Sequence, residues 1–130
     1  MMQGGNAIVG SGISKLKMLY SFAIEANMIF AIGHIGYAFV EYDNLNEPAL
    51  WFFSAALAII FNAGLNILCL SEYRRLTHII AMIANLALLI FSVVLAIVIT
   101  EIQTVCFAVV VLYTVVVCYS HNKRMRQKPI

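Results

Sequence analysis

The chain has 130 residues, of which 63% are hydrophobic and only 11% are charged, and its formal net charge is +2. A soluble domain carries about 25% charged residues, so this composition excludes an ordinary soluble protein. The mean hydropathy of +0.94 and the absence of strand-like alternation predict an all-α membrane protein rather than a small barrel.

Four long apolar runs occupy most of the chain and predict four transmembrane helices. A helix needs roughly 20 apolar residues to cross a hydrocarbon core about 30 Å thick. The runs cover residues 18–40, 49–70, 76–99 and 102–120. Residues 18–120 are therefore expected to form one membrane domain, between a short N-terminal segment at 1–17 and a basic C-terminal tail at 121–130.

The basic residues predict how these helices are oriented. Lysine and arginine occur only before the first helix, between the second and third helices, and after the fourth helix. By the positive-inside rule, both termini then face the cytoplasm or its organellar equivalent, and consecutive helices form an antiparallel bundle. We expect a multi-pass integral protein of the plasma membrane, with an organellar inner membrane as the alternative.

The first helix carries polar residues on two opposite faces. Tyr20, Asn27 and His34 are spaced by seven residues, or two helical turns, and form one stripe. Lipid tails cannot satisfy such groups, so this stripe is expected to face the bundle interior. Glu25 lies on the other side of the helix, which predicts that it faces outward. An ionisable residue at this depth is a functional candidate, as an interface contact or as a coupling site.

Asparagines recur near the midplane on the next two helices. At a rise of 1.5 Å per residue, Asn62 and Asn85 fall at the depth of Asn27, within roughly 5 Å of the midplane, and Asn66 lies one turn deeper. We expect an amide layer that joins three helices through hydrogen bonds of about 0.6 kcal/mol each. The complete interior polar seam is predicted to contain Asn27, Asn62, Asn66, Asn85, His34 and Ser92.

His34 and Cys106 are weak candidates for a metal or heme ligand. Both fall in the outer half of the membrane, where a hydrogen bond from His34 to Ser92 is the better-supported expectation. His78 lies near the inner surface and His121 is predicted outside the membrane, so no histidine matches the depth of His34 for a bis-histidine heme. No cofactor is therefore expected from this chain alone. The last helix carries a weaker polar stripe formed by Gln103, Cys106, Val110, Tyr113 and Thr114.

The C-terminal tail is basic and follows directly on the last helix. Such a cluster can contact anionic lipid headgroups, and apart from it nothing supports nucleic-acid binding. Expected partners are therefore lipids, other membrane subunits, or further copies of the chain. The predicted headgroup contacts are Lys123, Arg124, Arg126 and Lys128.

Three functions fit these features. The first is a non-catalytic subunit with a structural or assembly role in a larger membrane complex, such as a respiratory, monooxygenase, channel or translocon assembly. It is favoured by the short connections, the absence of a cofactor motif and the two polar faces of the first helix. The second is a small oligomeric transporter or channel with Glu25 as its proton or cation coupling site. The third is a redox or heme-binding subunit that uses His34.

Overall fold

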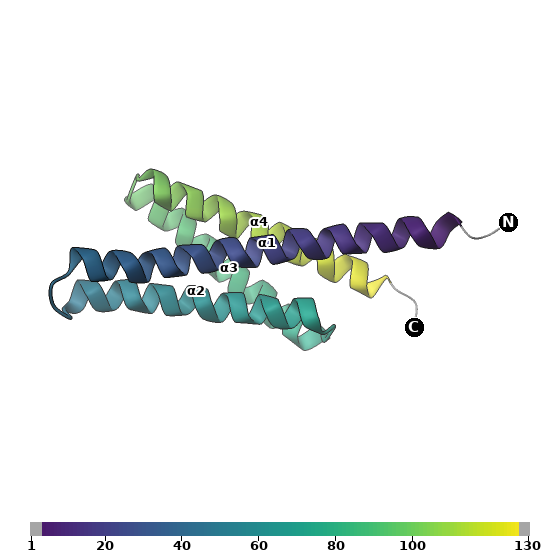
Figure 1. The fold of residues 1–130 in the computed structure, drawn as a ribbon, viewed down its shortest axis with the longest axis horizontal. Coiled ribbons are helices and arrows are strands. Elements are labelled where there is room, and N and C mark those ends of the chain that lie inside the picture. Colours follow the sequence, from purple (N-terminus) through teal and green to yellow (C-terminus); the bar gives the residue numbers. More distant parts are fainter. Residues whose placement is uncertain (1–3, 128–130) are drawn as a thin grey trace.

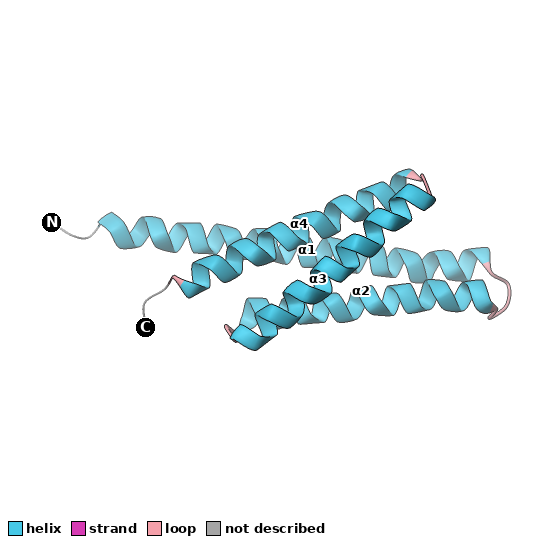
Figure 2. Cartoon of the chain, turned by 180° about the vertical axis from the view of Figure 1, so that it is seen from behind, coloured by secondary structure: helices cyan, strands magenta, loops and turns pink. Residues whose placement is uncertain are grey.

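The computed structural model describes the backbone of residues 4–127 and the side chains of residues 12–127. This part of the chain is all-helical, and every connection in it is short (Figure 2). All four helices are long and apolar enough to cross a membrane, which confirms the predicted all-helical class and is compatible with a multi-pass membrane protein. The helices are α1 (Gly4–Glu41), α2 (Glu47–Ser71), α3 (Arg75–Val98) and α4 (Ile102–Arg126).

The outer ends of α1 and α4 differ from the predicted helix ends. The helix α1 has 38 residues and begins at Gly4, so most of the predicted N-terminal segment is helical. At 1.5 Å per residue it is about 57 Å long, and it extends beyond the other helices at its N-terminal end (Figure 1). The helix α4 continues to Arg126. The length of an apolar run predicts the membrane-spanning part of a helix, whereas the hydrogen-bonded helical backbone can continue beyond that part. The basic residues in the last turn of α4 suit the negative end of the helix dipole.

The start of α2 has a complete cap. The Asn46 side chain accepts a hydrogen bond from the Ala49 backbone N–H at 3.0 Å, and Pro48 occupies the first helical turn. Proline suits this position because its missing N–H would have no partner within the helix. The connection between α1 and α2 therefore ends at Asn46, the N-cap of α2.

The four helices form two neighbouring pairs. Figure 1 shows α2 alongside α1, and α3 with α4, and α1 also packs against α4. The N- and C-terminal ends lie at the same end of the molecule as the α2–α3 turn, and the other two connections lie at the opposite end (Figure 1). We call these the terminal end and the loop end.

Small residues occupy much of the helix contact surface, and large apolar residues point outward. Leu57, Ile90 and Ile97, for example, are each more than half exposed. Small residues let helix backbones approach closely where water does not drive association. The interior is therefore held by close packing and by polar contacts. The fully buried alanines are Ala23, Ala31, Ala38, Ala49, Ala56, Ala63 and Ala81.

Candidate functional site

A buried cluster of amides joins α1, α2 and α3. The Oδ1 atom of Asn85 accepts hydrogen bonds from the Nδ2 atoms of Asn62 and Asn66, each at 2.9 Å. Asn85 donates in return to Asn66 Oδ1 at 2.9 Å, and the Tyr20 hydroxyl donates to the same oxygen at 2.7 Å. All four side chains are at most 6% exposed. We call these residues the amide cluster. Its amides are neutral, so they supply hydrogen bonds between helices rather than proton transfer.

A second polar contact joins α1 to α4. Asn27 Nδ2 donates to Thr114 Oγ1 at 2.8 Å and to the Ala23 carbonyl oxygen at 2.8 Å. Thr114 in turn donates to the Val110 carbonyl oxygen at 2.9 Å. Both side chains are buried. Together with the amide cluster, this pair links all four helices by side-chain hydrogen bonds.

The asparagines do not form the single layer that equal depth suggested. Asn27 bonds to Thr114, while Asn62 and Asn85 bond to each other. Asn66 completes the cluster because it lies four residues after Asn62, on the same face of α2, and so reaches the same partner. The depth of a residue specifies its height in the bundle, and the rotation of its helix decides which neighbour it meets.

The terminal end holds a second buried cluster, which the sequence analysis missed. The ring centroids of His78 and His121 are 5.7 Å apart with nearly parallel planes, and the Tyr20 ring lies 5.5 Å from His121. The thiols of Cys69 and Cys118 adjoin the Tyr20 hydroxyl. We call these five residues the histidine cluster. The two histidines come from α3 and α4, so their contact fastens these helices together near the terminal end.

His121 is the least satisfied polar residue of this cluster. It is 2% exposed, and neither of its ring nitrogens has a hydrogen-bond partner among the described residues. The sequence predicts His121 in a tail outside the membrane. In the structure α4 continues through this position, so His121 is helical and buried, and its ring contacts Tyr20 of α1. The missing signal was the spacing of Thr114, Cys118 and His121, which follows i, i+4, i+7 and places all three on one face.

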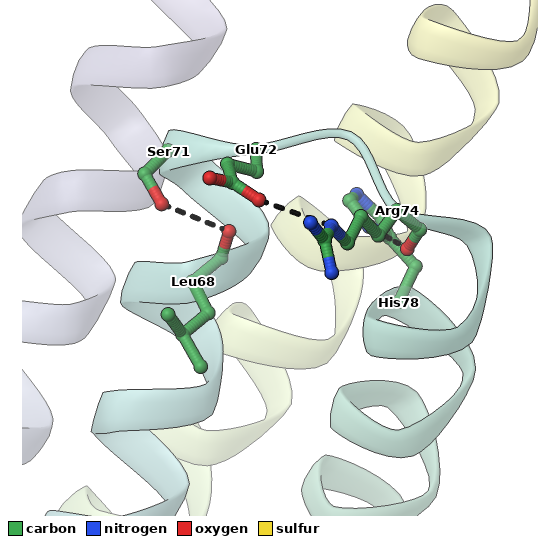
Figure 3. A network of polar contacts seen from close by, with 5 residues as sticks. All are labelled: Leu68, Ser71, Glu72, Arg74 and His78. Carbon is green, nitrogen blue, oxygen red and sulfur yellow. Dashed lines mark hydrogen bonds and ion pairs between the residues drawn. The ribbon is translucent and has the colours of Figure 1, made fainter.

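The α2–α3 turn closes the terminal end with local contacts (Figure 3). Arg74 Nε lies 3.2 Å from Glu72 Oε2 in an exposed ion pair. The Arg74 carbonyl oxygen lies 3.3 Å from His78 Nδ1, and the Ser71 hydroxyl donates to the Leu68 carbonyl oxygen at 3.1 Å. The contact with the Arg74 carbonyl oxygen thus orients the His78 ring near the start of α3. The exposed ion pair between Arg74 and Glu72 contributes little stability.

The expected hydrogen bond between His34 and Ser92 is absent. His34 Nδ1 lies 3.0 Å from the Phe30 carbonyl oxygen one turn earlier, and Ser92 donates to the Leu89 carbonyl oxygen at 2.9 Å. Each side chain therefore contacts a backbone carbonyl oxygen of its own helix instead of the other residue. The His34 ring packs beside Phe52 and Phe107 instead.

The polar stripe predicted for the last helix is rotated from the buried face. Cys106 and Gln103 are exposed, which removes Cys106 as a partner for His34 inside the bundle. A shift of one residue rotates a helical face by about 100°. Across the described residues, no group of three His, Cys, Asp or Glu side chains is arranged to hold a metal ion. The face of α4 that is buried consists of Thr104, Phe107, Val111, Thr114, Val117, Cys118 and His121.

Glu25 lies on the outer surface of α1. Its side chain is exposed, and the Ser21 hydroxyl donates to Glu25 Oε1 at 3.1 Å. The neighbouring residues Ile24 and Asn27 point inward and are buried. Within residues 12–127, Glu25 takes part in no ion pair. The carboxylate is therefore available to a group outside this chain.

The basic residues at the end of α4 have different surroundings. Arg124 Nη1 donates to the Gly12 carbonyl oxygen at 2.7 Å, so this residue ties α4 to α1. Lys123 and Arg126 are exposed and line a surface depression together with Tyr119. Lys128 lies outside the described residues. A headgroup contact is thus sterically open to Lys123 and Arg126, while the Arg124 side chain already has a protein partner.

Comparison with known proteins adds no relative: no family model, curated protein or solved structure matches this chain.

Proposed function

We propose that this protein is a small integral membrane subunit with a structural or assembly role in a larger membrane protein complex. The observation that carries the proposal is the outward position of Glu25, set against an interior whose amides bond mostly to one another. The amide cluster holds the helices to one another, so the outward carboxylate of Glu25 is left to bind a partner.

The proposal includes an orientation in the membrane. The chain is an antiparallel four-helix bundle with both termini in the cytoplasm, because every lysine and arginine lies toward the terminal end in the sequence order. The host membrane is the plasma membrane. Lys123 and Arg126 contact lipid headgroups there, since both are exposed at the end of α4.

The test is purification of the tagged chain from its native membranes in mild detergent, followed by mass measurement of the intact assembly. We expect a second, different membrane protein in a fixed ratio to the chain. Depletion of the chain should reduce the amount of the assembled partner, because a structural subunit stabilises its host. A chain that purifies alone, or only with copies of itself, would overturn the proposal.

An oligomeric transporter or channel is the second candidate, and the exposed carboxylate of Glu25 favours it. Because Glu25 points out of the bundle, the pathway would form between copies, with Glu25 as the proton or cation coupling site. In liposomes, the purified parent should then show proton-driven uptake, and Glu25→Gln should abolish uptake while the oligomer persists. A parent protein with no uptake across a panel of cationic substrates removes this candidate.

A further inference from the structure

Glu25 is the only charged residue within the four apolar runs at 18–40, 49–70, 76–99 and 102–120. It lies four residues, or about 6 Å, from the middle of the first run, which is well inside a hydrocarbon core about 30 Å thick. A charged side chain near the centre of a membrane helix is energetically costly unless it is paired. A partner that pairs with Glu25 would offset this cost.

Glu25 belongs to a continuous exposed face of α1. Its members alternate in steps of four and three residues, which is the heptad spacing of a left-handed helix contact. The apolar members are each at least 63% exposed, and a Cβ atom added at Gly36 would meet nothing within 4 Å. The backbone of a partner helix can therefore approach α1 closely at Gly36, and the side chains of that helix can pack between the larger side chains of α1. The face, which we call the α1 seam, consists of Met18, Phe22, Glu25, Ile29, Ile32 and Gly36.

We infer that the α1 seam binds a transmembrane helix of another protein that carries a lysine or arginine at the depth of Glu25. This inference rests on the proposed function and specifies the partner. Ser21 donates to only one carboxylate oxygen, Oε1, and Oε2 is left for a cationic donor. A single ionisable residue in an otherwise apolar seam also defines the register of the contact.

Charge complementarity distinguishes this partner from a second copy. The four apolar runs of the chain contain no lysine or arginine, so a copy brings no cation to the depth of Glu25. A parallel two-fold contact through the seam would instead bring two glutamates together, and two carboxylates that share a site repel each other. The cation must therefore come from a different chain.

The first part of the test is site-specific photocrosslinking in native membranes. A photoreactive residue at Phe22, Ile29 or Ile32 should crosslink to another membrane protein, and mass spectrometry should map the product to a helix with a buried lysine or arginine. Matched positions on the exposed face of α3, Ile83 and Ile90, should give little product. A crosslink from the seam to α1 of a second copy would overturn the inference.

The second part is a charge exchange with the basic residue so identified. Glu25→Lys should lower the crosslinking yield from the seam at least tenfold, and the reciprocal change of the partner's basic residue to glutamate should restore it. Failure of the exchange to restore the yield overturns the cationic contact. Crosslinks from α3 alone, within an intact complex, would overturn the seam and leave the proposed function standing. If the parent chain forms no complex with another membrane protein, by contrast, the proposed function itself is refuted.

Discussion

Single side chains account for most of the specificity inside this bundle. Many large apolar residues, such as Ile90, lie exposed on the outer surface, whereas Asn85 has three hydrogen bonds to two partners. In a membrane interior, each such bond contributes about 0.6 kcal/mol on average and at most about 1.7. The interior amides therefore determine which helix faces meet, while the net stability that they add is modest.

Replacement of Asn85 by leucine tests the amide cluster. Asn85→Leu removes three hydrogen bonds and leaves the amides of Asn62 and Asn66 with fewer partners, so we expect unfolding free energy in detergent to fall by about 1 to 3 kcal/mol. Unfolding by titration with urea or SDS measures this change in free energy. Ser120→Ala, which removes only a bond to its own helix backbone, should stay within about 0.5 kcal/mol of the parent. Equal stability of both variants would contradict the cluster's role.

His121 predicts an unusual response to mutation. Its ring nitrogens are buried without partners, and an unpaired buried polar group costs about 1 to 3 kcal/mol. His121→Phe keeps a ring beside Tyr20 and removes this cost, so the thermal midpoint should stay level or rise. His121→Ala leaves a cavity and should lower it. If both variants lose stability equally, the nitrogens have partners that stabilise the fold.

Whole helices show which features can be read from the sequence. The four long apolar helices were predictable, because an apolar run of about 20 residues is visible in the sequence itself. The outward side of Glu25 follows from helical periodicity, since Asn27 and Glu25 lie two residues apart. The buried face of α4 was not predictable from its polar stripe, because that helix is rich in valine and offers few polar markers. The i, i+4, i+7 spacing of Thr114, Cys118 and His121 marks the buried face in the sequence, and the structure shows all three residues buried.

The cap of α2 gives a test at the level of one helix. Asn46→Ala removes the hydrogen bond to the Ala49 N–H and should cost about 1 kcal/mol of unfolding free energy. Asn46→Asp and Asn46→Ser should keep most of it, because both side chains supply an oxygen at the same position. Chemical unfolding in detergent compares the three variants. An alanine variant as stable as the aspartate variant would mean that the cap contributes nothing.

At the scale of the whole molecule, the protein combines a buried amide cluster with four apolar runs in which Glu25 is the only charged residue. Its two helix pairs are linked through Asn27 and Thr114 near the middle and through the contact between Tyr20 of α1 and His121 of α4 at the terminal end. A body of this kind suits a structural role, because its helices are fixed to one another while α1 keeps an exposed face.

Topology follows from the distribution of charge over the molecule. Reporters fused at residues 1 and 130 should give signals from the same, cytoplasmic side, and a reporter inserted at residue 44 should give a signal from the other side. Paired phosphatase and fluorescent-protein fusions measure these positions. Signals from opposite sides for residues 1 and 130 would exclude four crossings.

If Glu25 serves assembly, the assembled complex depends on its side chain, and blue-native electrophoresis of solubilised native membranes measures this dependence. The measured quantity is the fraction of the chain found in the high-mass assembly. We predict that the parent and Ile90→Leu, a control on the exposed face of α3, run mainly in that assembly. Glu25→Gln should retain part of it, and Glu25→Leu should release most of the chain to low mass. An undiminished high-mass fraction in Glu25→Leu would exclude a role of Glu25 in assembly.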